Sequence, residues 1–117
     1  MNIFILDTNP SCATVQLCDK HVVKMVLETA QILCSALSIH GIATPYKATH
    51  VNHPCVKWAS ETWGNAMWLW RYGVYLGWEY TYRYGKVHKS ADVINWARPH
   101  IDAISGDYMT PFVQCMP

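Results

Sequence analysis

The stretch from Asp19 to Glu28 (DKHVVKMVLE) holds an imidazole, an ammonium and a carboxylate, three groups that can carry acid–base chemistry. If the stretch is helical, His21, Lys24 and Glu28 fall on one face together with Gln31. A mostly apolar stripe lies beside that face: Val22, Met25, Val26, Thr29 and Leu33. The face could bind and polarise a ligand. An ordinary solvated face, with Lys24 and Glu28 as an i,i+4 pair, explains the pattern equally well.

A second polar cluster is the segment from Tyr46 to Pro54 (YKATHVNHP), which enters a predicted helix. The backbone N–H groups at a helix N-terminus attract anions, so we predict ligand-binding roles for four residues: Lys47, His50, Asn52 and His53. Ordinary helix capping and loop hydrogen bonds are the alternative. The H-x-x-H spacing could hold two zinc ligands, but no third ligand is indicated by spacing, so we predict no metal and no cofactor.

The third cluster is Glu79 to Lys89 (EYTYRYGKVHK), where Glu79, Arg83 and Lys86 recur on one helical face. Arg83 can bind a phosphate while a neighbouring aromatic ring stacks on a base. We therefore predict that Tyr80, Arg83, Lys86 and His88 bind a ligand. The alternative is an Arg83–Glu79 pair on the surface with the tyrosines in the core.

Together the three clusters hold four of the six histidines and five of the six lysines. A surface that is merely solvated would spread these residues along the chain. We therefore predict one shared pocket, built from the first helix, the 46–54 loop and the end of the aromatic helix.

The elements that must position these residues are helices, and the chain of 117 residues suits one domain, 1–117. We predict a mostly α fold with a short extended lead-in, Asn2 to Leu6. The first helix runs from about Pro10 to about Ile39, with a break near Asp19, and Gly41 ends it. A short helix follows from Pro54 to about Glu61, capped by Asn52 or His53.

A second long helix is predicted from Thr62 to Tyr84, ended by Gly85. Its aromatic residues lie nearly all round, which is typical of a central, mostly buried helix. Ser90 should cap a last short helix, and Pro99 should stop it.

Composition narrows the function classes. Six Trp and seven Tyr against two Phe suit sites that are apolar and also form hydrogen bonds. The formal net charge of +1 argues against a wide basic track for duplex DNA, so we expect a shallow salt dependence of binding. Five cysteines without C-x-x-C predict no disulfide framework and a reduced, cytoplasmic setting. No membrane span is expected, because Arg71 and Glu79 interrupt the best candidate.

The element Leu17-Cys18-Asp19-Lys20-His21-Val22 resembles the L-x-D-Q-H-L element of the phage endonuclease V family, the pyrimidine-dimer DNA glycosylases. That family places its catalytic glutamate nine residues after the aspartate, and Glu28 stands there in this chain. The opening MNIFIL is similar to the family's N-terminal lead-in. The chain also resembles small phage proteins with D-K-H-V-V-K-M, T-H-x-N-H-P and E-Y-T-Y-R-Y-G-K-x-H-K elements.

The resemblance implies a compact helical fold that flips a base and forms an imine through its N-terminal amine, here that of Met1. It implies that Glu28 transfers protons and that His21 supports it by hydrogen bonding. The glycosylases expose a small residue after removal of the first methionine. Here Asn2 follows Met1, which normally leaves Met1 in place.

Two functions remain open at this point. The first is an endonuclease V-like phage enzyme in the host cytoplasm that cleaves an N-glycosidic bond in DNA or in a nucleotide. The second is a non-catalytic phage protein that sequesters a nucleotide signal of host defence in the same pocket. The apolar C-terminus is the one hint of a third function, a structural homo-oligomer.

Overall fold

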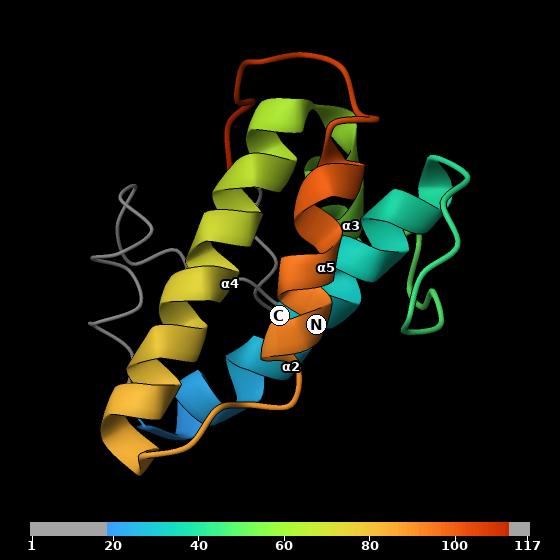
Figure 1. Ribbon diagram of the computed structural model, residues 1–117. Coiled ribbons are helices and arrows are strands. Elements are labelled where there is room, and N and C mark those ends of the chain that lie inside the picture. The colour runs from blue at the N-terminus through green and yellow to red at the C-terminus, as the bar shows by residue number, and fades with distance from the viewer. Residues whose placement is uncertain (1–18, 113–117) are drawn as a thin grey trace.

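The structure is a computed structural model that describes residues 19–112, with side chains from His21 onward. The described part contains four helices and no strand: α2 (Asp19–Ile39), α3 (Pro54–Glu61), α4 (Trp63–Tyr84) and α5 (Ala91–Ile101). In Figure 1, α4 and α5 lie side by side, and α2 crosses them. The mostly α fold predicted from the sequence is confirmed. The extended lead-in and the chain before Asp19 lie outside the described residues.

Helix α2 forms because its apolar residues recur with helical spacing, and it buries most of those from Val22 to Leu37, while Val23 and Leu27 are exposed. It ends after Ile39, where Gly41 takes a left-handed backbone conformation (φ 81°). The Gly41 N–H donates to the Ser38 carbonyl, and the Ile42 N–H donates to the Leu37 carbonyl. Gly41 therefore ends this helix as predicted.

Helices α3 and α4 begin and end at the residues that the sequence indicates. His53 caps α3, because its Nδ1 accepts a hydrogen bond from the Cys55 N–H at 3.1 Å. Thr62 separates the two helices, and its hydroxyl accepts from the Asn65 N–H at 3.0 Å. Gly85, at φ 71°, ends α4 by donating its N–H to the Thr81 carbonyl at 2.8 Å.

Helix α5 departs from the prediction at both ends. Ser90 occupies the position before the helix but makes no side-chain capping bond. Pro99 lies inside the helix, which continues to Ile101. Pro99 cannot donate to the carbonyl four residues before it and crowds that carbonyl with its ring, but it does not stop the two residues after it from taking helical backbone angles.

The core lies where α2 and α4 cross, and each of them packs against all three other helices. Trp58 of α3 and Tyr72 of α4 are fully buried there. Gly73 allows the close approach, because a Cβ at this position would lie 2.9 Å from Thr29 Cγ2 and 3.1 Å from Ile94 Cδ1. The aromatic helix is thus central, as predicted, but it shares that place with α2.

Two composition-based expectations need correction. Residues His21–Ile39 of α2 are long and apolar enough to cross a membrane, although 61% of that window is buried in the fold, as in the core helix of a soluble protein. Arg71 and Glu79 interrupt only the apolar sequence of α4. Cys55 is disulfide-bonded, whereas no disulfide framework was expected. Cys34 is a free, buried thiol.

Candidate functional site

The predicted acid–base face is present on α2. Glu28 is almost buried, with 9% of its surface exposed. Lys24 lies one turn earlier and places its Nζ 3.8 Å from Glu28 Oε2, while most of its own side chain stays in solvent. His21 is half-buried on the same stretch. The face is therefore not simply solvated, because its carboxylate is shielded from water. Met1, the predicted source of the amine, lies outside the described residues.

The 46–54 loop packs against the second half of α2, where the Thr49 N–H donates to the Ser35 hydroxyl at 3.1 Å. Ser35 follows Glu28 by seven residues, about 10 Å along the helix axis. The side chains of Lys47, His50 and Asn52 on this loop are exposed.

His53 has a structural role as the cap of α3. Its Nδ1 accepts a backbone N–H, which requires that nitrogen to be unprotonated. Burial lowers the pKa of His53, and the neighbouring His50 acts in the same direction.

Arg83 and Glu79 form the ion pair that the sequence offered as the alternative to phosphate binding. Arg83 Nε lies 3.3 Å from Glu79 Oε2, and both side chains are largely shielded. Tyr80 is buried as that alternative requires, but Tyr82 and Tyr84 are exposed. Lys86 is also exposed.

His88 connects α2 and α4 with the residue that precedes α5, through two hydrogen bonds and one ring contact. Its Nδ1 accepts from the Ser90 N–H at 3.0 Å, so Nε2 carries the ring proton and donates to the Val23 carbonyl at 3.2 Å. The ring edge packs on Tyr80, with 4.9 Å between ring centroids. Ser90 Oγ in turn lies 3.0 Å from the Tyr46 hydroxyl. The first and third clusters therefore meet at His88, and the loop joins them through Tyr46.

Several exposed lysines and several exposed carboxylates gather at opposite ends of α4, although Asp92, exposed in the first turn of α5, follows Lys89 by three residues. Helix α4 has 22 residues, about 33 Å, and spans nearly the whole longest dimension of 35 Å. Three exposed lysines lie at the end where α4 stops: Lys24, Lys86 and Lys89. Three exposed carboxylates lie at the end where α4 begins: Glu61, Asp102 and Asp107. We call the end with the three lysines the basic end. The formal net charge of +1 does not reveal this local positive charge.

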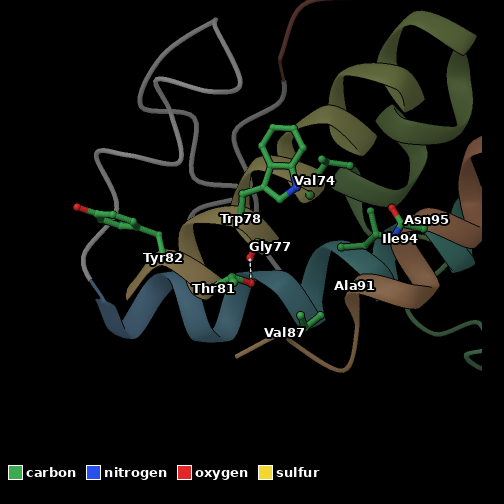
Figure 2. Close-up of a pocket in the computed structure, with 10 residues that line it drawn as sticks. Val74, Gly77, Trp78, Thr81, Tyr82, Val87, Ala91, Ile94 and Asn95 are labelled. Carbon is green, nitrogen blue, oxygen red and sulfur yellow. Dashed lines mark hydrogen bonds between the residues drawn. The ribbon is translucent and has the colours of Figure 1, made fainter. Parts of the chain in front are cut away.

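The surface beside α4 has two depressions, of which the first brings together three predicted ligand-binding residues, Tyr80, Lys86 and His88, and the second was not predicted from the sequence. A hollow of about 250 Å³ at the basic end is lined by Tyr80, Lys86, Val87, His88 and Lys89. An apolar groove of about 520 Å³ runs between α4 and α5 and includes Gly73, Gly77, Trp78, Val87 and Asn95 (Figure 2). Trp78 is 65% exposed. The Gly73–Gly77 spacing could have indicated the groove from the sequence, because two glycines four residues apart leave a gap on one face of a helix.

His50 and His53 have the H-x-x-H spacing of two zinc ligands. Within residues 21–112, no three side chains of His, Cys, Asp or Glu gather in a way that could hold a metal ion.

A model of the family described as pyrimidine dimer DNA glycosylase matches residues 1–93. The chain belongs to the pyrimidine dimer DNA glycosylase family. The match includes Glu28, the 46–54 loop and the basic end, and it stops inside α5. Comparison with curated proteins and with solved structures found no match. The resemblance seen in the sequence is therefore confirmed at the level of the family, and it indicates interaction with DNA.

His53 and His88 each accept a backbone N–H at Nδ1, and their pKa values predict how the stability of this family member depends on pH. Burial lowers the pKa of His88 from its ordinary value of 6.5, although the hydrogen bond to the Val23 carbonyl acts in the opposite direction. The pKa of His53 is lowered too. As pH falls below about 6.5, the unfolded chain takes up protons before the folded one does. The stabilisation is therefore complete above this pH and is lost as pH falls toward the lowered values.

Thermal unfolding at pH 7.5 and pH 5.5 measures this effect, and the melting temperature should be lower at pH 5.5. His88→Gln keeps an amide donor for the Val23 carbonyl but does not titrate, so it should reduce the difference between the two temperatures. An unchanged difference in this variant would show that His88 does not contribute to the pH dependence.

Proposed function

We propose that this protein is a DNA N-glycosylase that acts on a damaged pyrimidine, with Glu28 as the proton-transfer residue. The observation that carries the proposal is that the family match includes a shielded carboxylate on α2, one turn from Lys24 and next to the basic end. A carboxylate shielded from water can exchange protons with a reacting group without competition from solvent.

In the proposed reaction, the α-amine of Met1 attacks the sugar carbon C1′ of the damaged nucleotide. The C1′–N bond breaks, and the base leaves with the bonding electron pair and a proton. Opening of the sugar ring and loss of a proton from the amine nitrogen then form the imine. An α-amine has a pKa near 8, so a useful fraction is neutral at pH 7.

Glu28 is suited to move the protons in these steps. The protonated carboxyl would donate to the leaving base or to the ring oxygen, and the carboxylate would accept the proton from the amine. His21 is the proposed hydrogen-bonding support on the same face. The reaction needs no metal or cofactor.

The basic end offers a surface for the DNA backbone. Lys24, Lys86 and Lys89 are exposed near the α2 face that carries Glu28, whereas Glu61, Asp102 and Asp107 are exposed at the other end of α4. Asp92, three residues after Lys89, is an exposed carboxylate on the side of the basic end. Phosphate contacts fix the register of a protein on DNA, so this placement would bring the sugar–base bond toward α2. The sequestering function, the phage origin, the host cytoplasm and a homo-oligomer remain predictions from the sequence.

The test is borohydride trapping on duplex DNA that carries one cyclobutane pyrimidine dimer. The protein should break one C1′–N bond of the dimer, whose base stays linked to the neighbouring pyrimidine through the cyclobutane ring. Borohydride should yield a covalent adduct on residue 1, located by peptide mass spectrometry. Protein with an acetylated N-terminus is the control and should give neither product. If the unmodified protein leaves dimer-containing DNA intact but binds mononucleotides at the α2 face, the sequestering function replaces the glycosylase.

A further inference from the structure

We propose that the groove between α4 and α5, together with the adjoining hollow, binds one nucleotide, with its base against Trp78 and its phosphate at Lys86 and Lys89. This site is separate from Glu28 and does not depend on the proposed reaction.

The groove fits a planar, uncharged ring. The backbone of Gly73 and Gly77 leaves the space open, and the side chains around it are mainly apolar. The exposed indole of Trp78 borders the groove, and an indole face stacks on any base (Figure 2). Asn95 lies on the α5 side of the groove, where its amide can both donate to and accept from the edge of a base. A base in the groove could therefore stack on Trp78 and form a hydrogen bond with Asn95.

The hollow fits an anion. Lys86 and Lys89 are exposed at it, and their positive charges have no acidic partner among the residues that line the hollow. Its wall is held in place, because the His88 ring is fixed by the Ser90 N–H and by the Val23 carbonyl. An anion site built on a fixed loop loses less conformational entropy on binding.

The two depressions are joined at one residue. Val87 lines both the groove and the hollow, so an aromatic ring in the first and a phosphate in the second would be separated by about one side chain. A nucleotide has this order of parts, with the sugar between the base and the phosphate. Neither a free phosphate nor an apolar molecule would use both depressions.

The probes are dAMP, deoxyadenosine and deoxyribose 5-phosphate, titrated by calorimetry into the full chain. We expect dAMP to bind more tightly than either fragment. A single-stranded oligonucleotide of deoxyadenosine is titrated as well, because a nucleotide within a strand presents the same chemistry.

Two kinds of variant separate the halves of the site. Gly77→Leu should block the groove, and it is tolerable because a Cβ at Gly77 meets only Ala91 Cβ, at 4.0 Å. It should weaken dAMP and deoxyadenosine alike, as should Trp78→Ala, by about 5- to 150-fold for the loss of one stack. The double variant Lys86→Gln/Lys89→Gln should lower the affinity for dAMP to that for deoxyadenosine. Lys57→Gln, on exposed α3 surface, is the control for charge.

The results distinguish a free nucleotide from a nucleotide within a strand, and some of them would overturn the proposal. Oligonucleotide binding that depends on Trp78 and Gly77, without dAMP binding, would assign the site to a nucleotide within a strand. Binding that Gly77→Leu and Trp78→Ala leave unchanged, or no binding of any probe, would overturn the proposal. Glu28→Gln should leave the binding of dAMP intact, so failure of the glycosylase assignment and failure of this site are distinguishable.

Discussion

Glu28→Gln should lower the rate of glycosidic cleavage by about 10²- to 10⁴-fold, the usual contribution of a positioned acid–base group. The amide keeps the shape of the side chain but cannot transfer a proton. The variant should still fold, because Glu28 lies at the edge of the core rather than inside it. Single-turnover cleavage of dimer-containing DNA measures the rate, and thermal unfolding checks the fold.

Glu79→Gln is the matched control for this experiment. Glu79 is also a shielded carboxylate on a helix, and it also pairs with a basic residue four positions away, Arg83. Loss of a structural ion pair should change stability slightly and leave the rate within about threefold of the original, because Glu79 has no proposed role in chemistry. Equal rates for Glu28→Gln and the unmodified protein would refute the assignment of Glu28.

The helix boundaries could be predicted where a single local interaction decides them. Pro54, Thr62 and Gly85 set the ends of α3 and α4 through backbone geometry and capping bonds with near neighbours in the chain. Pro99 misled the prediction because a proline disturbs the turn before it, through its missing N–H and its ring, while the residues after it can still take helical backbone angles. Where the helix stops after Pro99 is decided by packing of Ile101 and Ile104 in the core, which is not local.

The candidate site was less accessible to sequence reasoning, because it depends on which segments meet. The pattern on α2 indicated Glu28, but it could not show that His88, 65 residues after Val23, contacts the same helix. Trp78 belongs to a helix that the sequence predicts to be mostly buried, but its side chain is exposed beside the groove between α4 and α5. The two charged ends likewise depend on the fold, because α4 holds the residues near 61 and those near 86 apart.

Because the lysines gather at one end, duplex DNA binding should depend on salt more steeply than the net charge alone suggests. Each neutralised phosphate contributes about −0.9 to the slope of log affinity against log salt. The double variant Lys86→Gln/Lys89→Gln should therefore reduce the magnitude of the slope by up to about 1.8, and weaken binding at low salt. Fluorescence anisotropy with a duplex, over a salt range of about 50–300 mM, measures the slope.

The double variant Lys57→Gln/Arg71→Gln provides the comparison. It removes the same formal charge from exposed positions on α3 and in the middle of α4, away from the basic end. If DNA responds only to net charge, both double variants should change the slope equally. If the basic end contacts the backbone, as the segregation of charge suggests, only Lys86→Gln/Lys89→Gln should change it. A shallow slope in the unmodified protein, unaffected by either variant, would remove the basic end as the DNA-binding surface.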